Sequence, residues 1–262
     1  MDYLHFNRAA WDQKTEQHIY SDFYELDAFL KGKNVLRNVE RELLGNVEGL
    51  KILHLQCHFG LDSLSLARMG ASVTGVDLSE KAIQKATELN DELGTDAQFV
   101  CCDLYDLPNQ LNGQFDLVFT SYGTIGWLPD LEKWAAVIRR YLKPGGRFIM
   151  VDFHPFLWTF DDAMKNISYD YFKADPIVET VKGTYAQRDA AIETTTVSWN
   201  HSLSEILSSL IQAGLELRSF QEHDFSPYNC FQNLKERSKD EFVFEHIPYR
   251  IPMLYSLEAR MS

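Results

Sequence analysis

Hydrophobic and polar positions follow two alternating periods between about residues 50 and 153. Runs that are apolar on both faces, such as Lys51–Leu55, are typical of central parallel strands. Between these runs, apolar residues recur at helical spacing, as at Ala82, Ala86 and Leu89. The strands expected from this pattern lie at 51–55, 71–76, 97–102, 114–120 and 147–153. The alternation predicts an α/β fold, a parallel sheet wrapped by helices on both faces, with a ligand at the carboxyl ends of its strands.

Residues 1–48 precede this pattern and are rich in aromatic side chains. Apolar spacing at Phe23, Leu26 and Leu30 suits a helical face, and a second helix is expected from Asn34 to about Leu44. Two interpretations stay open for this segment. It is a helical cap packed on the core, or a lid that closes over a ligand.

The alternation also breaks after the fifth strand. Residues 155–199 contain two β segments, Ile177–Tyr185 and Ile192–Ser198, joined by a polar turn. They predict an inserted antiparallel unit near the ligand site, with simple edge packing as the other interpretation.

The remaining residues return to helix and strand patterns, with strands expected at Leu215–His223 and Ile251–Met261. We therefore expect one overall domain with a helical cap at 1–48, a core at 49–154 and 200–262, and an insertion at 155–199.

The turn after the first strand is the main candidate for ligand binding. Gly60 lets a ligand approach the backbone, and the following helix, capped by Asp62 or Ser63, offers unpaired N–H groups. Asp77 ends the second strand, seventeen residues after Gly60. A carboxylate at that place can accept hydrogen bonds from both hydroxyls of a ribose, so the pair predicts a nucleotide-like ligand.

Composition narrows the class of protein. The chain has 262 residues, 45% of them hydrophobic, which suits a globular α/β domain. Its formal net charge of −13 argues against general nucleic-acid binding and against anionic membrane surfaces. The N-terminus lacks signal-peptide features, no apolar run reaches membrane-spanning length, and the neighbours Cys101 and Cys102 are poor disulfide partners. These features predict a reduced, cytoplasmic protein.

Together these segments resemble the class I S-adenosylmethionine-dependent methyltransferases, in the small-molecule branch. The resemblance rests on the Gly60 to Asp77 spacing, Asp103 at the third strand end, Phe115–Val118, and Leu142–Arg147 before the fifth strand. It implies a Rossmann-like, doubly wound sheet of about seven strands, mostly parallel with a late antiparallel strand. It also implies S-adenosyl-L-methionine as cofactor, S-adenosylhomocysteine as product, and in-line SN2 methyl transfer to a small-molecule acceptor, catalysed mainly by positioning.

The resemblance further implies which residues contact the cofactor. The expected contacts of the methionine part are Gln56, Cys57, His58 and Gly60. Asp77 is expected to bind the ribose, and Ser121 and Tyr122 are expected near the sulfonium. The expected contacts of the adenine are Leu78, Asp103 and Leu104. The family's acidic residue and first two glycines are replaced here by His54, Gln56 and His58. Because glycine supplies conformational freedom, the replacement predicts a narrower pocket and altered cofactor affinity.

The acceptor side is less defined by sequence. His154, directly after the fifth strand, is the candidate general base, with a structural role as the other interpretation. Tyr122 is a second catalytic candidate. Candidate substrate contacts are Trp11, Tyr20, Tyr185 and His201, and their aromatic surroundings suggest an apolar or ring-bearing acceptor.

Other functions stay in view. His54, Cys57 and His58 invite a metal interpretation, but no Cys-x-x-Cys or His-x-x-x-His pair supports it, so no metal is expected. The altered first motif keeps open a non-catalytic cofactor-binding sensor or partner protein of the same fold. An NAD-linked oxidoreductase would need Gly-x-Gly-x-x-Gly, which is absent, and nothing specific favours a polyamine-forming transferase. The oligomer is expected to be a monomer or a homodimer.

Overall fold

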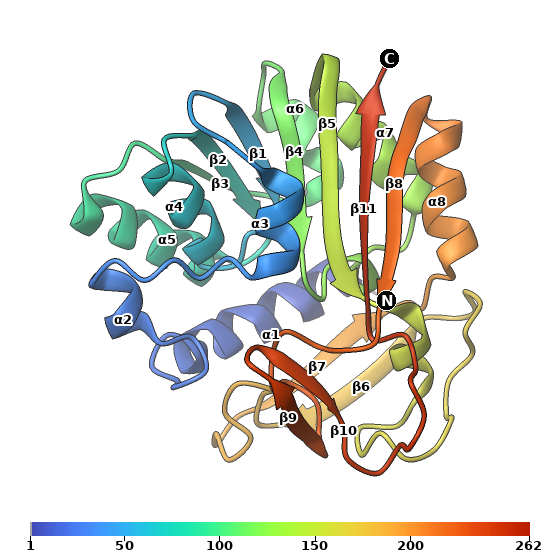
Figure 1. Cartoon of the computed structure of the whole chain (residues 1–262). Helices are drawn as coiled ribbons and strands as arrows, with labels where there is room; N and C mark the ends of the chain where they lie inside the picture. Colours follow the sequence, from blue (N-terminus) through green and yellow to red (C-terminus); the bar gives the residue numbers. More distant parts are fainter. Residues whose placement is uncertain (1) are drawn as a thin grey trace.

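A seven-stranded sheet forms the centre of the computed structural model, which describes residues 2–262 (Figure 1). Its strand order is β3-β2-β1-β4-β5-β11-β8, and only β11 runs antiparallel to its neighbours, β5 and β8. The strands are β1 (Lys51–Leu55), β2 (Ser72–Asp77), β3 (Gln98–Cys101), β4 (Phe115–Ser121), β5 (Leu142–Phe153), β8 (Leu215–His223) and β11 (Leu254–Met261). The predicted Rossmann-like sheet with a late antiparallel strand is confirmed.

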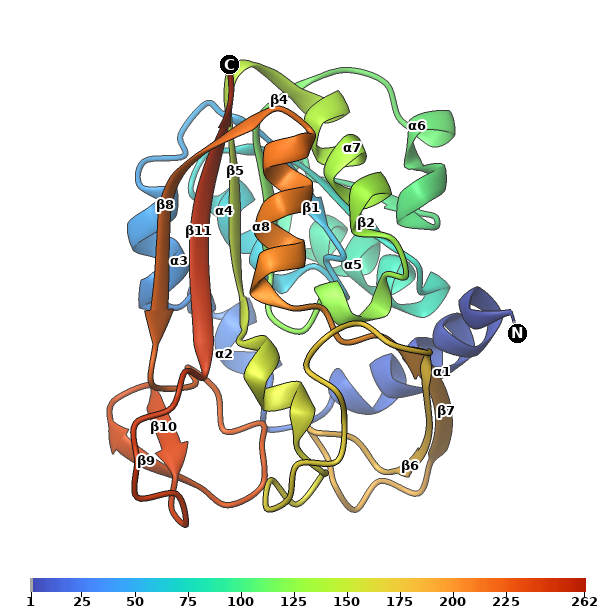
Figure 2. The same ribbon diagram turned by 90° about the vertical axis from the view of Figure 1, so that its right-hand side faces the viewer.

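Helices cover both faces of the sheet, as Figures 1 and 2 show. One face carries α3 (Asn38–Leu44), α4 (Leu61–Arg68) and α5 (Glu80–Leu93), and the other carries α6 (Leu107–Gln110), α7 (Leu131–Tyr141) and α8 (Leu203–Gln212). The remaining helices are α1 (Tyr3–His18), α2 (Leu26–Leu30) and the 3-10 turns η1 (Leu104–Asp106), η2 (Ile125–Trp127) and η3 (Pro155–Thr159).

Each face of the sheet buries its own apolar cluster. On β1, Ile52 packs under α3, α4 and α5, whereas Leu53 and Leu55 pack under the opposite layer. On β4, Phe119 and Val118 divide in the same way. Strands buried on both sides must be apolar throughout, which is why these runs could be identified in the sequence.

Two small hairpins lie beyond the carboxyl ends of the parallel strands, and the one formed by β6 and β7 lies beside α1 (Figures 1 and 2). The first pairs β6 (Ile177–Lys182) with β7 (Glu193–Ser198), as predicted. The second pairs β9 (Leu234–Ser238) with β10 (Glu241–Phe244) and was not predicted. Most of β9 is charged and exposed, so it lacks the alternating apolar pattern that announces a strand.

Some boundaries differ from expectation. The helix expected from Asn34 begins at Asn38, where Glu40 accepts from the Arg37 N–H in a capping contact. The fifth strand begins at Leu142 rather than Arg147, because Leu142 pairs with Phe115 before a register irregularity. Neither difference moves a strand end that faces the site.

Helix α1 is attached to two different elements. The Asn7 side chain donates to the Val197 carbonyl of β7 at 2.8 Å and accepts from its N–H at 2.8 Å. The Asp12 carboxylate accepts from the Ser79 hydroxyl at 2.6 Å, at the start of α5. These bonds hold α1 across the carboxyl edge of the sheet. Across residues 2–262, no helix combines the length and apolar character needed to cross a membrane.

Candidate functional site

A cavity of about 710 Å³ opens at the carboxyl ends of the parallel strands, bounded by α1, the β6–β7 hairpin and the loop after β8. Its volume falls within the range of about 300–1,000 Å³ usual for small-molecule sites. The sequence-predicted residues that line it are Trp11, Gln56, Cys57, His58, Gly60, Asp77, Leu78, Asp103, Leu104, Ser121, Tyr122 and Tyr185. The structure therefore brings both expected cofactor and acceptor candidates to one cavity.

The turn after β1 keeps a left-handed backbone at three positions. The φ angles are 54° at Gln56, 53° at His58 and 79° at Gly60. A non-glycine residue in this region costs roughly 1–2 kcal/mol, and such strain gathers at functional sites. A Cβ at Gly60 would lie 2.8 Å from the Phe99 ring, so glycine is required there for space as well. The turn retains a glycine-like backbone although two of these three positions carry side chains.

Two buried polar atoms, one near the end of β1 and one on this turn, have no partner among residues 2–262. His54 Nδ1 is 2.8 Å from the Ser63 hydroxyl, but its Nε2 makes no hydrogen bond. Gln56 Nε2 donates to the Thr124 carbonyl at 2.9 Å, and its Oε1 accepts nothing. Burial lowers the pKa of His54 to about 3, so its ring is neutral, and Nε2 accepts in the tautomer whose Nδ1 donates to the Ser63 hydroxyl. Both residues line the cavity and offer acceptors to a ligand that donates hydrogen bonds.

Carboxylates stand at the ends of neighbouring strands. Asp77, at the end of β2, accepts from the His58 N–H at 2.8 Å and from the Ser79 N–H at 2.9 Å. Burial raises the pKa of Asp77 to about 6. Asp103 follows β3, and burial also raises its pKa. Both retain lone pairs that can accept from ligand hydroxyl or amino groups.

The loop after β4 is shaped by one buried carboxylate. Asp152, 1% exposed, accepts from the Gly123 N–H, from the Thr124 N–H at 3.1 Å and hydroxyl at 2.9 Å, and from the Ile125 N–H at 3.3 Å. Desolvation raises the pKa of Asp152. Next to this loop Tyr122 holds a φ of 48°, which is uncommon for a bulky residue. The Asp152 carboxylate thus stabilises the strained segment that presents Tyr122 to the cavity.

The Tyr122 hydroxyl donates to Glu40 Oε2, and Glu40 is fully buried on α3 behind it. Burial, with the nearby Asp62 carboxylate, raises the pKa of Glu40 to about 7. A carboxyl group of this pKa can take up or release a proton near neutral pH.

The raised pKa makes stability depend on pH. Because the folded-state pKa of Glu40 lies above its ordinary value of 4.5, the folded protein holds the extra proton between pH 4.5 and 7. Stability therefore falls as pH rises through this window. As pH rises from 4.5 to 8, we expect the free energy of unfolding of Glu40→Gln to increase by up to about 3 kcal/mol relative to that of wild type. Urea unfolding measures this difference. Glu42→Gln, exposed on the same helix, is the control, and a pH-independent difference at Glu40 would contradict this account.

His154 does not line this cavity, which corrects the expectation that it is the base. Its Nε2 is 2.9 Å from Glu222 Oε1 of β8, and its Nδ1 accepts from the Phe156 N–H at 3.1 Å. The strand ends at Phe153, and His154 caps η3, so its ring turns away from the site. With its accepting nitrogen already used, His154 has a structural role.

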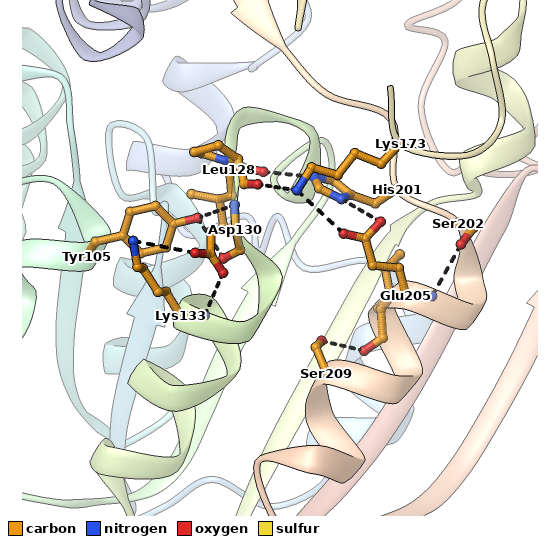
Figure 3. A network of polar contacts seen from close by, with 11 residues as sticks. Tyr105, Leu128, Asp130, Lys133, Lys173, His201, Ser202, Glu205 and Ser209 are labelled. Atoms are coloured by element: carbon orange, nitrogen blue, oxygen red, sulfur yellow. Dashed lines mark hydrogen bonds and ion pairs between the residues drawn. The ribbon is translucent and has the colours of Figure 1, made fainter. Parts of the chain in front are cut away.

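His201 and Tyr20 are also corrections to the expected substrate contacts. The His201 side chain is fully buried outside the cavity, with Nε2 2.8 Å from the Leu128 carbonyl and Nδ1 3.1 Å from Glu205 Oε2 (Figure 3). It joins the segment after η2 to the start of α8. Tyr20 is 85% exposed and lies outside the cavity lining.

Several cavity groups were missed by sequence reasoning. They are Lys14, Arg37, Asp62 and Asp152, which line the cavity, and Glu40 behind Tyr122. Asp152 carried a usable signal, since it is an acidic residue at a strand end. Within residues 2–262, no three His, Cys, Asp or Glu side chains gather in a way that could hold a metal ion.

Solved structures share this fold. A magnesium protoporphyrin IX methyltransferase of Synechocystis, crystallised with S-adenosylmethionine, superposes with a TM-score of 0.56 at 16% identity, covering 100% of this chain and 98% of that one. An S-adenosylmethionine-dependent methyltransferase of Mesorhizobium loti gives 0.56 at 19% identity, covering 88% and 99%. At these identities the likeness concerns the fold.

Sequence comparisons are more specific. Residues 52–146 match a family model described as a methyltransferase domain. The chain is 26% identical over 206 residues to a ubiquinone biosynthesis O-methyltransferase of Bordetella avium, covering 78% of this chain and 77% of that protein. It is 37% identical over 131 residues to an uncharacterized methyltransferase of Synechocystis, covering 49% and 59%. Residues 52–146 form a methyltransferase domain, and the fold is that of the class I S-adenosylmethionine-dependent methyltransferases.

The groups in the cavity of this methyltransferase fit its cofactor, S-adenosylmethionine. Carboxylates at Asp77 and Asp103 match hydroxyl and amino donors, and the unsatisfied acceptors on His54 and Gln56 match an ammonium group. The electron-rich rings in the lining, such as Trp127, suit a sulfonium.

Proposed function

We propose that this methyltransferase methylates a hydroxyl group on an apolar, ring-bearing small molecule. The observation that carries the proposal is the Tyr122–Glu40 pair, which places a proton acceptor at the cavity. Aromatic side chains surround the same end of the cavity, and Phe153 and Phe231 contact at 5.0 Å between ring centroids. The ubiquinone biosynthesis O-methyltransferase relative also supports an oxygen acceptor.

In this proposal the cofactor is held at the strand ends. Asp77 binds the ribose, Leu78, Asp103 and Leu104 bind the adenine, and residues Gln56 to Gly60 bind the methionine part. Ser121 and Tyr122 lie near the sulfonium. The cofactor supplies an electrophilic methyl group. The protein aligns the acceptor and excludes water, so positioning does most of the catalysis.

An acceptor hydroxyl also has a proton to lose, and we assign this step to Tyr122. Its phenolic oxygen takes the acceptor's proton while its own proton moves to the Glu40 carboxylate. Tyr122 takes the place that sequence reasoning gave to His154. Tyr185 and Trp11 line the cavity as acceptor contacts in this proposal.

The net charge of the chain limits the partners that we propose. We propose that the enzyme works in the cytoplasm as a monomer or a homodimer, on a free small molecule. A net charge of −13 supports the absence of general nucleic-acid binding.

Replacing Asp77 by alanine tests the cofactor placement. We expect wild type to bind S-adenosylhomocysteine in the micromolar range by calorimetry, and Asp77→Ala to bind about 10- to 100-fold more weakly, because hydrogen bonds to a charged group are lost. Asp91→Ala, exposed on α5, is the control. If Asp77→Ala binds S-adenosylhomocysteine as tightly as wild type does, the placement of the ribose on Asp77 is wrong.

Transfer itself is tested with S-adenosylmethionine carrying a tritiated methyl group and a panel of phenols and catechols. Label on a ring hydroxyl supports the proposal. Tight cofactor binding with no transfer across the panel favours the rival, a non-catalytic cofactor-binding protein.

A further inference from the structure

Lys14 is a partly buried cation that lines the cavity and has no anionic partner among residues 2–262. It follows Trp11 by one turn on the face of α1 that lines the site. Among residues 2–262, its ammonium has no hydrogen-bond or ion-pair partner. Its Nζ lies 5.1 Å from the Trp11 ring centroid and 5.7 Å from that of Trp127. Two indole faces therefore hold the ammonium, but no anion neutralises it.

Among residues 2–262, no carboxylate forms an ion pair with Lys14. Glu179 on β6 acts only from a distance, and its carboxylate accepts from the Tyr169 hydroxyl. Desolvation lowers the pKa values of the neighbouring His18 and His58, which stay neutral. A desolvated ammonium without an anionic partner is unfavourable, and desolvation lowers the pKa of Lys14 to about 8. An anionic ligand would remove this penalty.

Helix α1 places Lys14 at a definite distance along the cavity. Tyr3, at the start of the helix, lies near Asp103. Burial raises the pKa of Tyr3, and the charge of the Asp103 carboxylate raises it further. Lys14 is eleven residues further on, or about 16 Å along the helix axis. There the Trp11 ring meets the His58 ring at 5.4 Å. Lys14 is thus at the end of the cavity next to the turn after β1.

We propose that Lys14 binds the carboxylate of the cofactor's amino-acid end. The inference rests on the proposed cofactor placement and adds the group that recognises this charge. The amino-acid end carries an ammonium and a carboxylate. The unsatisfied acceptors His54 Nε2 and Gln56 Oε1 suit the ammonium, and the Lys14 ammonium suits the carboxylate.

The test compares S-adenosylhomocysteine with its decarboxylated analogue, which keeps the amine and the thioether. We expect Lys14→Met to bind S-adenosylhomocysteine about 10- to 100-fold more weakly than wild type and to bind the analogue with unchanged affinity. Calorimetry measures both affinities. Lys14→Arg is expected to retain most of the preference for the carboxylate. Lys81→Met, a half-exposed lysine on α5, should bind both ligands as wild type does.

Stability gives a second, independent readout. Because Lys14→Met removes a desolvated charge that has no anionic partner, the ligand-free variant should unfold at the same or a higher temperature than wild type. A less stable variant, or equal loss of both ligands, would show a structural role and overturn the inference. Unchanged S-adenosylhomocysteine affinity in Lys14→Met would also overturn it. If wild type itself fails to bind S-adenosylhomocysteine, the proposed cofactor placement fails first.

Discussion

Tyr122→Phe is expected to lower the rate of methyl transfer about 100-fold or more, while S-adenosylhomocysteine affinity changes little. The substitution keeps the ring but removes the hydroxyl that donates to Glu40. Without it the acceptor has no path for its proton at this end of the cavity. The measurement is the initial rate of tritiated methyl transfer to the phenolic acceptor that wild type uses best.

The pH profile ties this effect to Glu40. Wild-type rates should rise as pH increases through about 7, because Glu40 accepts a proton only when ionised and burial raises its pKa to about 7. Glu40→Gln should be slow and lack this rise. Tyr20→Phe is the control, since Tyr20 is exposed and lies outside the cavity lining. A Tyr122→Phe enzyme with wild-type rates would remove Tyr122 from the mechanism.

Asp152→Ala is expected to lower the free energy of unfolding by about 3–5 kcal/mol. The variant leaves the N–H groups of Gly123, Thr124 and Ile125 without their buried acceptor. The loop they belong to also supplies the Thr124 carbonyl that holds Gln56. We therefore expect S-adenosylhomocysteine binding to weaken as well, and urea unfolding and calorimetry measure the two effects.

Two further variants make the Asp152 result specific. Asp106→Ala removes a carboxylate that accepts from the exposed Asn109 and Gln110 amides, so its free energy of unfolding should stay close to that of wild type. Asp152→Asn keeps the shape and one accepting oxygen, and should fall between wild type and Asp152→Ala. A loss at Asp152 no larger than at Asp106 would contradict the role given to this carboxylate.

The residues proposed to bind the cofactor could be expected from sequence to lie together, because they directly follow strand ends. Asp77 and Asp103 each close an apolar run, and Gly60 marks the turn between strand and helix. Parallel strands bring such ends to one edge, so local patterns were enough to gather them. The same logic gave the sheet itself, since strands buried on both faces are apolar throughout.

The acceptor end could not be derived in this way. Glu40 lies on a short helix among charged neighbours and has the pattern of a solvent-exposed residue, yet contact with Tyr122 buries it. His154 has the right place in sequence, but the chain turns after Phe153 and directs its ring toward Glu222. Lys14 lies on α1, which bonds to the hairpin of β6 and β7, and both elements line the cavity. Each of these outcomes depends on packing between distant segments, which periodicity does not report.

The structure of the complex with S-adenosylhomocysteine tests the central claim most directly. We expect the ligand in the cavity under α1, with its ribose hydroxyls on Asp77 and its carboxylate near Lys14, and with space left beside Tyr122 for an acceptor. Density for the ligand outside this cavity, or a ribose that does not contact Asp77, would contradict the placement on which the proposed mechanism depends.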